Sequence, residues 1–93
     1  MAKPRLAASY DKHSPGFPRR EEPGRRKNLK YMTSFEATWH DGHVYDPVQA
    51  AYVNVHMEAY CVDGWAWDSQ DVYLFRYYAL ALAPDFVEMV MSR

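Results

Sequence analysis

The spacing of proline and glycine in the first third of the chain most constrains what it can fold into. Proline fixes φ and lacks a backbone donor, so closely spaced prolines interrupt any helix or strand ladder. This stretch also has few apolar side chains to offset the entropy lost on ordering. We therefore expect an extended or disordered basic arm over residues 1–31 and a small folded domain over residues 32–93. The breakers are Pro4, Pro15, Gly16, Pro18, Pro23 and Gly24.

The net charge changes sign near the same boundary, between residues 30 and 31. Residues 1–30 carry nine basic and three acidic side chains, a net charge of +6, whereas residues 31–93 have a net charge of −7. The overall net charge of −1 conceals this asymmetry, and two halves of opposite sign favour different partners.

The arm is the strongest interaction signal in the sequence. Arginine pairs with phosphate and carboxylate groups, so the arm could follow RNA, an anionic lipid surface or an acidic protein groove. Glu21 and Glu22 lie between two basic clusters and lower the local potential, which weakens the nucleic-acid interpretation. The predicted contact residues of the arm are Arg19, Arg20, Arg25, Arg26, Lys27 and Lys30.

A short β-hairpin is predicted over about residues 34–45. Apolar and polar side chains alternate up to Trp39, and Asp41-Gly42 is a residue pair typical of a two-residue turn. The hairpin would place His40 and His43 opposite each other across the strands.

The apolar residues of 47–62 fit both the two-residue period of a strand and the 3.6-residue period of a helix. Alternation from Val53 to Cys61 suits a strand, while a second apolar set recurs at helical spacing. The boundaries favour a helix, because Asp46 can cap it, Pro47 suits its first turn and Gly64 suits its end.

Two more helices follow in the sequence pattern. An apolar stripe predicts a helix over residues 70–83, capped by Asp68 or Ser69 and stopped by Pro84. A last short helix is expected over residues 85–91. The predicted fold class is therefore α+β, a hairpin packed with two to three helices.

The folded domain is rich in aromatic residues, holding 12 of the 15 in the chain. Tyrosine and tryptophan combine apolar area with a polar group and are enriched at protein interfaces. The predicted docking residues of the domain are Tyr52, Tyr60, Trp65, Trp67, Tyr73 and Tyr77.

Catalytic and metal-binding patterns are weak. His40, His43 and His56 are the metal candidates, but their spacing matches no zinc motif, and we predict neither a metal nor a cofactor. Cys61 has no nearby cation to activate it and is expected to be a buried thiol. No nucleophile or phosphate-binding motif is present, so an enzyme is not predicted.

The leading hypothesis is a non-catalytic accessory subunit that docks on protein subunits of a larger assembly. The single cysteine indicates a reducing, intracellular compartment such as the cytoplasm or an organelle matrix, and no apolar run is long enough to span a membrane. One alternative is an acidic inhibitor that mimics nucleic acid. Another is a metal- or histidine-dependent enzyme built on the hairpin sequence His40-Asp41-Gly42-His43.

Overall fold

The structure is a computed structural model that describes residues 3–93. It has a four-stranded mixed sheet and three helices, which confirms the α+β class. The elements in chain order are β1 (Arg5–Leu6), α1 (Arg25–Met32), β2 (Trp39–Asp46), β3 (Ala51–Val62), β4 (Trp65–Asp68), α2 (Ser69–Tyr78) and α3 (Pro84–Met91).

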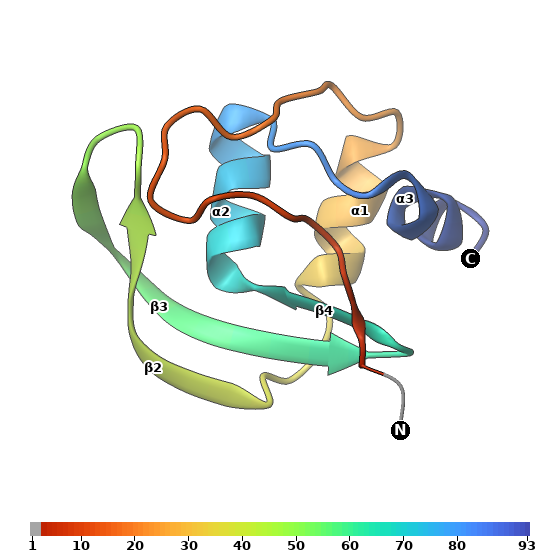
Figure 1. The fold of residues 1–93 in the computed structure, drawn as a ribbon. Coiled ribbons are helices and arrows are strands. Elements are labelled where there is room, and N and C mark those ends of the chain that lie inside the picture. Colours follow the sequence, from red (N-terminus) through yellow and green to blue (C-terminus); the bar gives the residue numbers. More distant parts are fainter. Residues whose placement is uncertain (1–2) are drawn as a thin grey trace.

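The sheet has the strand order β1-β4-β3-β2. β1 pairs parallel to β4, and the β4-β3 and β3-β2 pairs are antiparallel. The three helices lie on one side of this sheet, and the segment after β1 crosses in front of α2 on its way to α1 (Figure 1). Within residues 3–93, no helix is both long and apolar enough to cross a bilayer.

The hairpin exists, but its turn is not at Asp41-Gly42. Those two residues lie inside β2, where the pairing register shifts between His40 and His43 and Gly42 adopts a φ of +69°. The chain reverses instead after Asp46, and β3 then returns alongside β2. The extra residue in β2 explains the error, because a glycine with a positive φ serves a bulge of this kind as well as a two-residue hairpin turn.

The predicted helix over residues 47–62 is wrong, since residues 51–62 form the long strand β3. Asp46 does act like a helix cap, because its Oδ1 accepts hydrogen bonds from the Val48 and Gln49 amides at 2.8 and 3.0 Å. However, Ala50 adopts a left-handed φ of 53°, which ends the turn at once. Pairing with β2 on one side and β4 on the other then favours the alternating pattern.

The two C-terminal helices are confirmed with different bounds. α2 begins with a reciprocal capping box: Asp68 Oδ1 accepts from the Asp71 amide at 2.8 Å, and Asp71 Oδ2 accepts from the Asp68 amide at 3.0 Å. α2 ends at Tyr78, earlier than predicted, because Ala79 has a left-handed φ of 57°. Pro84 opens α3, where its missing donor costs nothing.

The N-terminal arm is folded onto the domain over its described residues. Ala7, Ala8 and Phe17 are buried in the core, and Arg19 forms an isolated bridge with Leu80. The last part of the arm becomes α1, which the sequence did not predict. All four prolines of the arm precede Gly24, whose φ of 69° sets the start of the helix.

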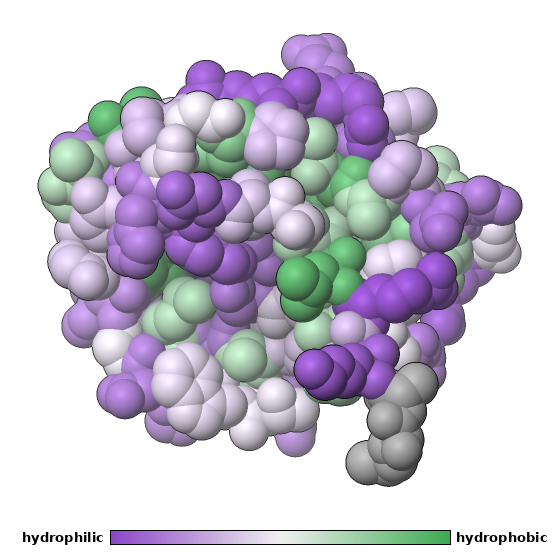
Figure 2. Space-filling view, in the orientation of Figure 1, coloured by the Kyte–Doolittle hydropathy of each residue, from purple (hydrophilic) through white to green (hydrophobic). Residues whose placement is uncertain are grey.

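Aromatic side chains fill the space between sheet and helices. Trp65 and Trp67 of β4 pack edge-on against Phe86 of α3, at 5.3 and 5.6 Å between ring centroids. The Trp67 indole donates to the Met32 carbonyl at 3.0 Å, which joins β4 to α1. Figure 2 shows the face that the segment after β1 crosses. On this face, polar side chains divide the apolar surface into patches.

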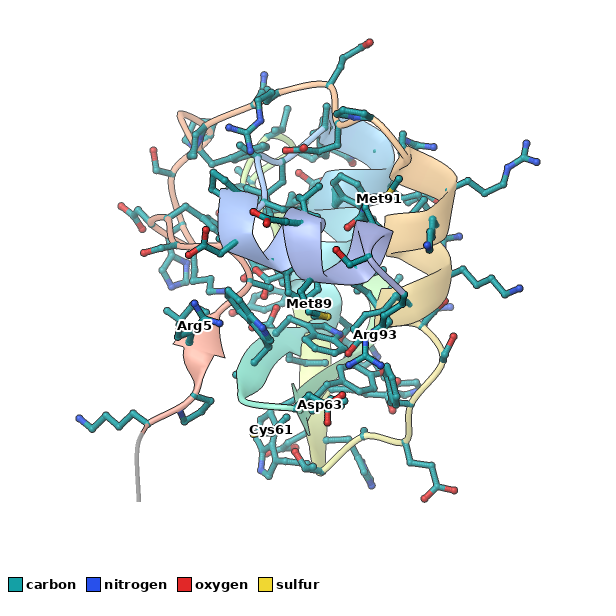
Figure 3. All side chains as sticks on the ribbon, turned by 90° about the vertical axis from the view of Figure 1, so that its right-hand side faces the viewer. Arg5, Cys61, Asp63, Met89, Met91 and Arg93 are labelled. Atoms are coloured by element: carbon teal, nitrogen blue, oxygen red, sulfur yellow. The ribbon has the colours of Figure 1, made fainter. Side chains whose placement is uncertain are left out.

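The C-terminus contacts the turn between β3 and β4. Arg93, just after α3, points toward Asp63 in the β3–β4 turn (Figure 3), and the two side chains form an ion pair at 2.6 Å. Its guanidinium also lies 5.2 Å from the Tyr31 ring centroid. Both contacts are partly exposed, so they position the C-terminus and add little stability.

Candidate docking groove

A tyrosine-lined groove runs between α2 and β3. Two hollows of about 250 and 510 Å³ share Val55, Tyr73 and Tyr77, and therefore adjoin along one groove. We call it the docking groove. Its other lining residues are Thr33, Gln49, Tyr60, Ser69, Val72, Arg76 and Tyr78.

Helical periodicity places the tyrosines along the groove. Tyr73 and Tyr77 are four residues apart on α2, and their ring centroids are 5.0 Å apart. Phe75 lies on the opposite side of the helix with Leu74 beside it, and both are buried. α2 therefore has one face in the core and one tyrosine face toward the groove, where Tyr77 is 63% exposed.

A buried carboxylate holds one end of the groove. Asp46 is fully buried, and its Oδ2 accepts hydrogen bonds from the hydroxyls of Tyr73 and Tyr78 at 2.7 and 2.8 Å. Burial alone would raise the pKa of Asp46, but these hydroxyls and the two turn amides outweigh it and lower the pKa. Burial and the bond to Asp46 raise the pKa of Tyr73. The groove wall is thus tied to the hairpin turn.

A second polar cluster fixes the arm to α2. Asp71 Oδ1 accepts from the Tyr10 hydroxyl at 2.7 Å and from Lys12 Nζ at 3.0 Å, and Lys12 also contacts Asp68 at 3.2 Å. Burial, followed by the charge of Asp68, raises the pKa of Asp71 to about 6, against the lowering effect of Lys12. These carboxylate oxygens are bonded within the chain, so the cluster serves as a structural anchor beside a hollow of about 290 Å³.

The predicted docking residues of the domain divide into three groups. Tyr60, Tyr73 and Tyr77 line the docking groove. Tyr52 is 70% exposed and packs against Tyr45 on the hairpin, outside the groove. Trp65 and Trp67 are each 3% exposed and belong to the core, so their assignment to a docking surface is wrong.

Sequence reasoning missed Val55 and Arg76. Val55 lines the groove only because β3 passes beside α2, a placement that the predicted helix concealed. Arg76 follows from the helical spacing of Tyr73 and Tyr77, since it lies on the same side of α2.

Four of the six predicted contact cations of the arm bond back onto the molecule. Arg19 stacks on Phe17, with its guanidinium 4.4 Å from the ring centroid, and Arg20 bonds to Glu22 and to the Leu82 carbonyl. The Arg25 guanidinium donates to the backbone carbonyl of Arg76, and Lys27 donates to those of Met91 and Arg93. Arg26 and Lys30 are exposed on α1.

The histidines do not meet as the hairpin prediction required. His40 and His43 lie in the same strand; His40 is opposite Glu58, and His43 stacks on His56 with centroids 5.2 Å apart. In residues 3–93, no group of three or more His, Cys, Asp or Glu side chains is placed to hold a metal ion. Cys61 is exposed rather than buried, because it points away from the helices (Figure 3).

The acidic side chains are scattered. Asp46 and Asp71 are buried, and Asp63 is paired with Arg93 at the far end of β3. Asp46 and Asp71 therefore add nothing to an acidic surface, and the charge of Asp63 is balanced by Arg93.

A comparison of the chain with known protein families, with curated proteins and with solved structures gives no match in any of the three.

Proposed function

We propose that this chain is a non-catalytic accessory subunit that binds a protein partner through the docking groove. The observation that carries the proposal is the groove in which Tyr73 is fixed by buried Asp46 while Tyr77 and Val55 stay exposed. A rigid aromatic wall beside exposed apolar side chains is the arrangement that binding hot spots favour.

Rigidity supports binding in energetic terms. A side chain that is already ordered loses less conformational entropy when a partner arrives, a saving of about 0.5–1.5 kcal/mol per side chain. Tyr73 and Tyr78 share the Asp46 carboxylate, so their orientation is set before binding.

The folded arm gives the proposal a specific form. The arm braces α2 through Tyr10 and Lys12, and so it supports the groove from within the molecule. Docking therefore takes place on the domain surface, and the described part of the arm contributes the cations of α1 to that surface.

Affinity purification from the native source tests the proposal. The full chain, the groove variant Val55→Asp/Tyr77→Ala and the control Tyr52→Ala would each be tagged, and captured proteins would be quantified by mass spectrometry. We expect one set of proteins to be lost at least tenfold with the groove variant and retained with Tyr52→Ala. Equal capture by all three would contradict the proposal, once circular dichroism shows that the variants are folded.

A further inference from the structure

The helix side of the docking groove is basic. Arg76 lines it directly, as does Thr33 at the end of α1. Arg26 and Lys30 precede Thr33 by seven and three residues, so all three lie on one face of α1. The bond from the Arg25 guanidinium to the Arg76 carbonyl brings α1 against the C-terminal part of α2.

These cations are available to a partner. The ion pairs formed within residues 3–93 use Arg5, Lys12, Arg20 and Arg93 as their basic members. Arg26, Lys30 and Arg76 take part in none of them and are exposed. Arg76 on the groove, with Arg26 and Lys30 on the face of α1 that ends at Thr33, creates a positive potential that selects anionic partners.

The strand side of the groove differs. Val55 and Tyr60 line it, and Glu58 lies close enough that its charge, after burial, raises the pKa of Tyr60. A nucleic acid presents phosphates along its whole length and favours cations on both walls. A groove lined by apolar and tyrosine side chains, with a basic helix side and an acidic residue near its strand side, fits a protein segment better.

The length of the groove suits a short segment. α2 has ten residues and is therefore about 15 Å long. This matches roughly three turns of a partner helix, which bury apolar side chains at i, i+3, i+4 and i+7.

We infer that the partner enters the docking groove with an acidic amphipathic segment, whose apolar side chains contact Val55, Tyr73 and Tyr77. Its carboxylates face Arg26, Lys30 and Arg76. This inference rests on the proposed docking function and specifies the chemistry of the partner.

Selection from a random 16-residue peptide phage library on the immobilised full chain tests the inference. We expect enriched peptides to combine Leu, Phe or Trp with an excess of Asp and Glu. A fluorescein-labelled consensus peptide would then be titrated by anisotropy. Its affinity should fall at least fivefold for Arg76→Glu and for Lys30→Glu, stay unchanged for the control Lys3→Glu, and weaken with added salt.

The possible results distinguish the acidic-partner inference from the proposed docking function on which it rests. Enriched neutral or basic peptides that lose binding to Val55→Asp/Tyr77→Ala would overturn the acidic partner and leave the docking function standing. No enrichment, or peptides indifferent to that groove variant, would contradict both. A fluorescein-labelled 20-residue oligouridine that binds more tightly than the peptide and depends on Arg76 would overturn the inference in favour of RNA.

Discussion

Asp46 is the residue on which the hairpin turn and the groove wall both depend. Its two carboxylate oxygens accept four hydrogen bonds, two from the turn amides and two from the tyrosine hydroxyls. A buried carboxylate without such donors would cost several kcal/mol, so this one is stable only because its donors are in place.

The lowered pKa of Asp46 predicts a pH-dependent mutant effect. A carboxyl with a lowered folded pKa stabilises the fold above its unfolded pKa of about 3.9 and loses that contribution as the pH falls through the folded value. Tyr73→Phe/Tyr78→Phe should therefore reduce the free energy of unfolding by roughly 1.5–3 kcal/mol per bond at pH 7. The reduction should be smaller at pH 2.5.

Urea unfolding followed by tryptophan fluorescence at the two pH values measures this difference. A reduction of the same size at both would show that the hydroxyls do not act through an ionised Asp46.

Gly24 provides a second residue-scale prediction. Both Gly24 and Gly42 have a φ of +69°, but a Cβ on Gly24 would lie 2.3 Å from Met91 Sδ, while nothing lies within 4 Å at Gly42. Each alanine substitution should cost about 1–2 kcal/mol for the left-handed backbone. Gly24→Ala should cost about 1 kcal/mol more, because Met91 must move.

Thermal unfolding of the two variants gives the comparison. Adding Met91→Ala to Gly24→Ala should recover the extra stability that the clash with Met91 costs. An equal loss for both glycines would mean that Met91 moves freely.

At the scale of elements, the contact between the arm and α2 depends on Lys12 opposite Asp71. The raised pKa of Asp71 means that its ionised form opposes folding, so this group favours the fold below pH 4 and loses that advantage as the pH rises through about 6. Lys12→Met removes the compensating cation. The loss should be about 1–2 kcal/mol at pH 7.5, discounted because Lys12 is 40% exposed, and smaller at pH 4.5.

Chemical denaturation of Lys12→Met and wild type at both pH values measures the effect. A loss that is larger at the lower pH would contradict the assigned role of Asp71.

The elements show which local signals can be trusted. The apolar stripe of α2, its cap candidates Asp68 and Ser69, and Pro84 beyond it were sufficient to predict that helix. The signals at Asp46 and Gly64 were ambiguous, because an aspartate that caps a helix and one that caps a turn make the same hydrogen bonds. Only pairing with β2 and β4, which no local pattern contains, distinguishes the two. The groove was predictable at Tyr73 and Tyr77 of α2 and at Tyr60 of β3, but not at Val55.

At the scale of the whole molecule, the arm is part of the fold. Phe17 is buried, its ring lies against Tyr10 and Tyr78, and β1 extends the sheet. Composition suggested disorder because the arm holds few apolar residues, yet those few are the ones that enter the core.

Limited proteolysis tests this placement. Trypsin should cut after Arg19, Arg20 and Arg25 slowly, at a rate set by unfolding of the domain. Urea below the unfolding midpoint should therefore accelerate cleavage strongly, because global unfolding exposes a large surface. Rapid cleavage at these sites with the rest of the chain intact would show that the arm is detached in solution.

The central claim, that a protein partner occupies the docking groove, is tested most directly by photo-crosslinking. A benzoylphenylalanine at position 77 lies in the groove, and one at position 52 lies on an equally exposed tyrosine outside it. After irradiation in the native source, position 77 should give one dominant crosslinked protein, joined through an acidic segment, and position 52 should give none. A partner crosslinked equally from both positions, or from position 52 alone, would contradict the claim.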